Sequence, residues 1–166
     1  TEEHLDVLGA WDWVRAKGIP AERIGIAGVS FGSMNAVIAG GREPAVAAVW
    51  ADSSTTRMDL AMGNFVVDQL HDPTGLARLL VPGAMVWAQV VAGDDLGRYN
   101  PIDEVDHYGG RSIAFVHGAL DPVLPASMSI ELHDRAVAAG ATTPAVWIVA
   151  DAGHTEAVFR DPAGYE

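Results

Sequence analysis

Ser30 is the residue whose surroundings first indicate chemistry, because it is the centre of the pentapeptide GVSFG at positions 28–32, directly after the apolar run 24–27. At a junction of strand and helix, the pattern G-x-S-x-G forces the serine into a crowded backbone conformation. Glycines two positions before and after it remove the Cβ atoms that would clash with the neighbouring chain. The turn lifts the hydroxyl clear of the sheet, so the sequence predicts a nucleophilic serine; a glycine-rich turn with a capping serine is the alternative.

An acid and a base follow Ser30 at the ends of two later predicted strands. The apolar strand 112–117 leads into the loop that contains Asp121, and the strand 145–150 leads into the segment that contains His154. The carboxyl ends of parallel strands meet at one edge of a sheet, which is where ligands bind. We therefore expect a hydroxyl, a carboxylate and an imidazole at the same edge, in the chain order nucleophile, acid, histidine.

These motifs resemble those of the α/β-hydrolase fold, and in particular those of bacterial serine esterases and of prolyl-oligopeptidase or serine-aminopeptidase relatives. The matching stretches are GVSFG at 28–32, HGALD at 117–121 and GH at 153–154, which together span most of the chain. The resemblance implies an α/β fold in which a parallel sheet is flanked by helices, and of which this chain holds the last four strands. It also implies a helical cap-like insertion near 55–110.

The resemblance assigns a role to four residues. Ser30 is the expected nucleophile, Asp121 the acid and His154 the base. The backbone N–H of Phe31 is one expected donor of the oxyanion hole. The expected reaction is cleavage of a carboxylic ester through a Ser-Asp-His triad and an acyl-enzyme intermediate. A serine peptidase of the prolyl-oligopeptidase or aminopeptidase type and an acyltransferase use the same triad and remain alternatives. A non-catalytic binding module is disfavoured, because a decayed enzyme usually loses one of the three residues.

Other acids and histidines compete for these roles. Asp52 also follows a predicted strand, at a position from which some hydrolases take their acid, but we expect it to cap a helix or hold a loop. His117 lies near the site at a strand end and is expected to brace the loop through hydrogen bonds. The remaining histidines lie in polar settings and are expected at the surface: His4, His71, His107 and His133.

The composition limits the classes of protein and of partner. A chain of 166 residues has the length of a single domain, and its hydrophobic content of 49% is enough to form a core. Its formal net charge of −12 argues against nucleic acid and anionic membranes as partners. No apolar run reaches the length of a membrane-spanning helix, and neither a metal-binding motif nor a phosphate-binding loop is present, so no cofactor or metal is expected. The expected partner is a small-molecule ester or peptide substrate.

The sequence contains no cysteine, which excludes disulfide bonds and a thiol nucleophile. The first residues do not have the basic and apolar regions of a signal peptide. Both observations are compatible with a cytoplasmic and with a secreted protein.

Apolar runs predict strands near 23–29, 45–51, 112–117 and 145–150, and the clearest helical patterns lie near 31–40 and 126–139. The strands are continuous apolar runs, which is typical of a parallel sheet covered on both faces. Right-handed crossovers place them in sequential order. A helix over 1–17 is expected before them, and its predicted buried face consists of Leu5, Leu8, Trp11 and Val14.

The insertion near 55–110 contains short helical patterns over 60–70, 74–80 and 84–91, with predicted breaks at 72–73, 82–83 and 100–101. Its large apolar side chains either line a pocket for the acyl group or side chain of a substrate, or pack the helices onto the sheet: Met58, Met62, Phe65, Met85 and Trp87. The second interpretation is favoured for each of them, because apolar residues at helical spacing usually belong to the core.

We expect the whole chain, 1–166, to belong to a single α/β-hydrolase domain that is truncated at its N-terminus and at its last helix. In the resembled fold, about four strands and two helices precede the segment that begins this chain, and they supply the second oxyanion N–H. The strand 23–29 would then lack a neighbour on one side, so the chain by itself is expected to associate.

Overall fold

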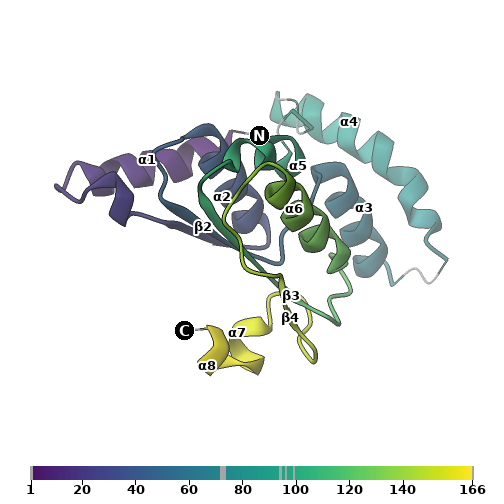
Figure 1. The fold of residues 1–166 in the computed structure, drawn as a ribbon. Coiled ribbons are helices and arrows are strands. Elements are labelled where there is room, and N and C mark those ends of the chain that lie inside the picture. Colours follow the sequence, from purple (N-terminus) through teal and green to yellow (C-terminus); the bar gives the residue numbers. More distant parts are fainter. Residues whose placement is uncertain (1, 72–73, 94, 96, 99, 166) are drawn as a thin grey trace.

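The computed structural model describes residues 2–71, 74–93, 95, 97–98 and 100–165. Within these residues lies a sheet of four parallel strands in sequential order (Figure 1). The strands are β1 (Ile26–Val29), β2 (Ala48–Asp52), β3 (Ser112–Gly118) and β4 (Trp147–Val149). The predicted fold class and strand order are confirmed, and each strand lies within one residue of its predicted range.

The register of the sheet brings the carboxyl ends of the strands to one edge. Val29 of β1 lies opposite Asp52 of β2, which lies opposite Val116 of β3. Gly118, the last residue of β3, lies opposite Val149, the last residue of β4. The loops that follow the strands therefore begin side by side, as the predicted site requires.

The helices that connect the strands pack on one face of the sheet. They are α2 (Phe31–Arg42) after β1, α5 (Pro101–Glu104) and the 3-10 helix η3 (Val105–Tyr108) before β3, and α6 (Ser127–Ala138) after β3. Their core includes Val37, Tyr108 and Leu132, which pack with Val49 and Phe115 of the strands. The helices predicted near 31–40 and 126–139 correspond to α2 and α6. Right-handed crossovers between successive parallel strands place every connecting helix on the same face, and this is the face that is covered.

Within the described residues, helices cover the second face of the sheet only near the carboxyl ends of the strands, so the predicted covering of both faces is seen there and not along the whole sheet. The last helices are α7 (Ala157–Arg160) and α8 (Pro162–Tyr165). They pack with Trp50, Val116 and Trp147. Farther along the same face, Ala27 and Ala114 line an open cavity of about 390 Å³ together with Trp50. Sequential strand order explains this, because it leaves no crossover helix for the second face.

Helix α1 (Glu3–Arg15) packs against α2, but its buried face differs from the predicted one. Trp11 is buried as predicted, whereas Leu5 is 50% exposed. His4, which was expected at the surface, is buried two helical turns before Trp11 on the same side of the helix, and burial lowers its pKa. Thr1, the predicted first residue of the helix, lies outside the described residues. A short 3-10 helix, η1 (Ala21–Arg23), follows before β1.

The insertion between β2 and β3 is helical, as predicted. It contains α3 (Met58–Gln69), the 3-10 helix η2 (Leu76–Leu80) and α4 (Val81–Ala92), followed by α5 and η3. The predicted break at 82–83 is wrong, because Pro82 lies in the first turn of α4, where a missing N–H costs no helical hydrogen bond. The break at 100–101 is confirmed, since Pro101 starts α5. The break at 72–73 falls outside the described residues.

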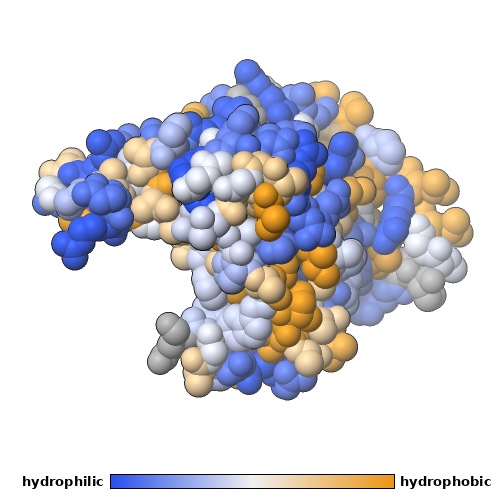
Figure 2. All heavy atoms as spheres, viewed as in Figure 1, coloured by the Kyte–Doolittle hydropathy of each residue, from blue (hydrophilic) through white to orange (hydrophobic). Residues whose placement is uncertain are grey.

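Helix α4 exposes several large apolar side chains. Trp87 and Val91 are each 69% exposed, and Val90 is 68% exposed. Figure 2 shows apolar residues gathered on this side of the molecule, over α3 and α4 at the right of the view. Among the described helices, none combines the length and the apolar character that crossing a membrane requires.

Candidate active site

Ser30 lies between the last residue of β1 and the first residue of α2, in a conformation that few residues adopt. Its φ and ψ are 55° and −120°, so a residue other than glycine has a positive φ here. Its backbone N–H donates to the carbonyl of Asp52 on β2 at 2.9 Å, and its own carbonyl accepts the N–H of Met34 at 3.1 Å. These bonds fix the turn that presents the half-buried serine at the carboxyl edge of the sheet.

One of the two glycines beside Ser30 is required sterically. A Cβ atom at Gly28 would overlap the backbone of Gly32 and Ser33, so this position demands glycine. A Cβ atom at Gly32 would meet nothing within 4 Å among the described residues. The predicted clash is therefore confirmed for Gly28 and is wrong for Gly32.

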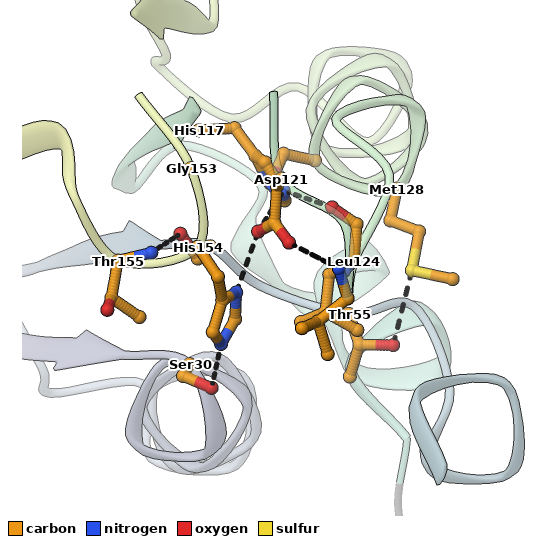
Figure 3. Close-up of polar contacts among 12 residues, drawn as sticks. Ser30, Thr55, His117, Asp121, Leu124, Met128, Gly153, His154 and Thr155 are labelled. Atoms are coloured by element: carbon orange, nitrogen blue, oxygen red, sulfur yellow. Dashed lines mark hydrogen bonds and ion pairs between the residues drawn. The ribbon is translucent and has the colours of Figure 1, made fainter. Parts of the chain in front are cut away.

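His154 connects Ser30 with Asp121 through both nitrogens of its ring (Figure 3). The N–H of His154 Nδ1 donates to Asp121 Oδ2 at 2.7 Å. Because a carboxylate only accepts, this contact fixes the proton on Nδ1 and leaves Nε2 of the neutral ring as an acceptor. Ser30 Oγ lies 2.8 Å from Nε2. The structure thus brings the predicted hydroxyl, imidazole and carboxylate into one continuous line of hydrogen bonds.

The Asp121 side chain is buried, yet it is surrounded by donors. Oδ1 accepts the backbone N–H groups of Val123 and Leu124, each at 2.8 Å. Oδ2 accepts from His154 and lies 3.3 Å from His117 Nε2. Burial raises the pKa of Asp121, but hydrogen bonds from the two imidazoles and from the Leu124 backbone outweigh it and hold that pKa well below its usual range. The carboxylate therefore stays charged at neutral pH.

His117 braces the Asp121 loop, as predicted. Its buried ring donates from Nε2 to the carbonyl of Leu124 at 2.8 Å, and the donor is identified by the carbonyl, which only accepts. Nδ1 of the same ring forms a hydrogen bond with the hydroxyl of Ser129 at 2.7 Å. The loop between β3 and α6 is tied to its own strand by these bonds, which hold Asp121 in place.

The acid loop and the histidine loop touch through their backbones. A Cβ atom at Gly118 would overlap the carbonyls of Ala152 and Gly153, so only glycine permits this approach. The N–H of Leu120 donates to the Ala152 carbonyl at 2.9 Å. The distance between the carboxylate and the imidazole is therefore set by backbone contacts as well as by the side chains.

Asp52, the alternative acid, is engaged with other groups. One oxygen of its buried carboxylate accepts the Ser53 hydroxyl at 2.9 Å, and the other accepts the Tyr165 hydroxyl at 2.9 Å. Asp52 therefore holds a loop and the C-terminal helix, in line with the prediction. Sequence reasoning missed Ser53 and Tyr165, which belong to no motif.

Phe31, the expected oxyanion donor, is the first residue of α2. A backbone N–H at this position has no acceptor inside its own helix, and the helix terminus carries partial positive charge. The N–H adjoins Ser30, so its placement suits an oxyanion, the negative charge that develops on a carbonyl oxygen when the serine attacks the carbonyl carbon. The role of Phe31 stays a prediction.

A cavity of about 470 Å³ opens beside Ser30 and His154. Its other lining residues come from α2, α3 and neighbouring loops: Phe31, Met34, Thr55, Met58, Ala61, Met62, Phe65, Gln69, Val123 and Leu124. No Asp, Glu, Lys or Arg is found among these described residues. In the described part of the chain, no group of three His, Cys, Asp or Glu residues is placed to hold a metal ion.

The five apolar residues considered for a substrate pocket divide between two environments. Met58, Met62 and Phe65 line the cavity beside Ser30. Met85 belongs to a buried cluster that also includes Met58, and it lines a second cavity between α3 and α4. Trp87 is 69% exposed. The pocket interpretation therefore fits the three residues of α3, while the packing interpretation fits Met85 and neither fits Trp87.

A scan of the sequence against family models finds no match, and a search of curated proteins finds none. Solved structures do match. An esterase from Pyrococcus furiosus superposes with a TM-score of 0.70 at 16% identity over 99% of this chain. An acylaminoacyl peptidase from Pyrococcus horikoshii gives a TM-score of 0.70 at 15% identity over 97% of it. A puromycin-hydrolysing peptidase from Mycobacterium tuberculosis gives 0.62 at 17% identity over 90%.

This chain spans 58%, 25% and 22% of the lengths of those three chains, in the same order. At these identities the likeness concerns the fold. The four parallel strands and their helices have the arrangement of part of the α/β-hydrolase fold, which confirms the resemblance inferred from the motifs.

Replacing Asp121 with Asn is expected to lower kcat on the order of 10⁴-fold, because an amide beside His154 favours the wrong ring tautomer. Asp52→Asn is expected to cost far less, because the Asp52 carboxylate contacts two hydroxyl groups and not the imidazole. The kcat of both variants is measured in the full-length protein with one p-nitrophenyl ester. If Asp52→Asn proved the more damaging change, the acid would be Asp52.

Proposed function

We propose that this chain carries the catalytic residues of a serine hydrolase, which cleaves a carboxylic ester through an acyl-enzyme intermediate. The observation that carries the proposal is the line of hydrogen bonds from Ser30 through His154 to the buried carboxylate of Asp121. The fold neighbours support a hydrolase in general terms, because those named above are an esterase and peptidases.

The first step of the proposed reaction is attack by Ser30 Oγ on the carbonyl carbon of the substrate. A serine hydroxyl is a weak nucleophile at neutral pH, so His154 Nε2, 2.8 Å away, takes its proton as the new C–O bond forms. The imidazolium that results keeps its Nδ1–H bond to Asp121, whose negative charge stabilises it. Because that carboxylate is buried and already charged, no rearrangement is needed when the positive charge develops.

The intermediate carries negative charge on the former carbonyl oxygen. The N–H of Phe31 is the proposed donor to this oxygen, and one such donor is worth roughly 10²–10³ in rate. His154 then passes its proton to the leaving alcohol, and the acyl group stays on Ser30. A water molecule that loses its proton to the same Nε2 releases the acid and restores the serine.

The cavity beside Ser30 favours an uncharged, apolar substrate group. Its lining, as far as the described residues form it, is largely apolar and contains no carboxylate that would bind the ammonium of a free peptide N-terminus. An ester with an apolar acyl chain would pack that chain against the apolar lining. A peptidase is the second candidate, because Met58, Met62 and Phe65 would pack equally well against an apolar side chain of a peptide. No feature of the described residues favours acyl transfer to an acceptor other than water.

Ser30→Ala in the full-length protein is expected to abolish ester turnover and leave the fold intact. The substitution removes the nucleophile, and the half-exposed hydroxyl contributes little packing. Turnover of p-nitrophenyl esters is measured beside the circular dichroism spectrum and the melting temperature. A folded variant that keeps more than a few per cent of wild-type turnover would contradict the assignment of Ser30 as the nucleophile.

Met62→Ala is expected to reduce kcat/KM for esters with long acyl chains roughly 10-fold relative to acetate esters, because it removes apolar contacts from the cavity. Trp87→Ala is the control, since Trp87 is exposed and lies outside the cavity lining. The ratio of kcat/KM for hexanoate and acetate esters is compared in both variants. An unchanged ratio in Met62→Ala, or an equal change in Trp87→Ala, would contradict the proposed acyl site.

A further inference from the structure

The end of β2 forms hydrogen bonds to the three segments of backbone that carry the proposed catalytic residues. The carbonyl of Asp52 accepts the N–H of Ser30 at 2.9 Å. The N–H of Ser53 donates to the carbonyl of Val116, on the strand that leads to Asp121, at 2.9 Å. The hydroxyl of Ser53 lies 3.3 Å from the N–H of Thr155, the residue that follows His154. Two consecutive residues therefore bond to the nucleophile turn, the acid strand and the histidine loop.

The direction of each hydrogen bond at the Ser53 hydroxyl is fixed by its partners. A backbone N–H only donates and a carboxylate only accepts. The hydroxyl proton of Ser53 is therefore given to Asp52 Oδ1 at 2.9 Å, which leaves the oxygen lone pairs to accept the N–H of Thr155. Asp52 is held in turn by the Tyr165 hydroxyl at 2.9 Å. The chain of bonds thus has one polarity, from the Thr155 N–H to the Asp52 carboxylate.

The backbone at both ends of the bond between Ser53 and Thr155 is strained. Their φ values are 52° and 60°, which residues other than glycine rarely adopt. Such conformations persist where the surrounding structure holds them in place. Asp52 and Ser53 are buried, at 1% and 0% exposure, so they form a firm support. Thr155 is only partly buried, and a shift of its backbone would also move the imidazole of the adjoining His154.

We propose that Ser53 is a positioning residue for His154: its hydroxyl, oriented by Asp52, holds the Thr155 N–H and so keeps the imidazole between Ser30 and Asp121. Ser53 does not line the cavity beside Ser30, so it acts through the histidine loop and not on the substrate. This inference rests on the proposed function, since it concerns the geometry of the same three residues.

Ser54 provides a matched control for this role. It is the next residue, its exposure is also 0%, and its hydroxyl has no hydrogen-bond partner among the described residues. Ser53→Ala and Ser54→Ala therefore remove the same atom from equally buried neighbours. Ser53→Gly is the second test variant, because glycine adopts the positive φ of this position without the strain that alanine would keep.

We expect both Ser53 variants in the full-length protein to lower kcat on the order of 10- to 100-fold, as a displaced catalytic group does, with KM within about twofold of wild type. Ser54→Ala keeps both constants within about twofold. The low-field proton resonance of the His154 Nδ1–H bond to Asp121 is the second readout. It weakens or disappears in the Ser53 variants and persists in Ser54→Ala.

Two outcomes overturn the role of Ser53. The first is a kcat in either folded Ser53 variant that matches Ser54→Ala, with the low-field resonance intact. The second is a loss of kcat in Ser54→Ala equal to that in the Ser53 variants, which would mark a general packing effect. Ser30→Ala separates the two proposals: retained turnover in that variant overturns the proposed function, whereas normal turnover in the Ser53 variants beside an inactive Ser30→Ala overturns the positioning role alone.

Discussion

The positive φ of Ser30 is the constraint on which the rest of the site depends, because the hydroxyl meets His154 only while this turn is kept. A strained residue of this kind costs on the order of 1–3 kcal/mol and persists when its surroundings determine it. Here the turn is held from two sides. The Ser30 N–H bonds to the carboxyl end of β2, and the glycine at position 28 allows the first turn of α2 to cross β1 without a clash. Burial of Val37 on α2 against strand residues such as Val49 and Phe115 anchors that helix to the sheet.

The second requirement of the site is a buried negative charge that costs little to keep. Two backbone N–H groups occupy one oxygen of Asp121, and two imidazoles approach the other. A carboxylate satisfied in this way stays ionised in spite of its burial, and it orients His154 before any substrate arrives. His117 serves both purposes, because its ring lies beside the carboxylate and bonds to the backbone of the same loop. The loop after β3 therefore provides both the buried negative charge and the contacts that fix its position.

The strand order and the placement of Ser30, Asp121 and His154 were predictable, because apolar runs locate parallel strands and their carboxyl ends share an edge. The role of Ser53 was not. Its partner Thr155 lies 102 positions away, and the contact depends on positive φ values that neither residue type favours. The burial of His4 could not be predicted either, because a histidine in a polar stretch does not indicate which side of α1 packs against α2. The spacing of apolar residues in the sequence predicts which side chains of α3 share a face. It does not predict where α3 lies relative to Ser30, so the cavity lining could not be predicted.

The proposed function requires that Ser30 is the nucleophile and that His154 activates it. The most direct measurement treats the full-length protein with a fluorophosphonate ester, digests it and locates the covalent adduct by mass spectrometry. We expect a single adduct, on the Ser30 oxygen, and we expect it not to form in a folded His154→Ala variant. An adduct on another serine, no adduct at all, or labelling of Ser30 that proceeds equally well without His154 would contradict the proposed function.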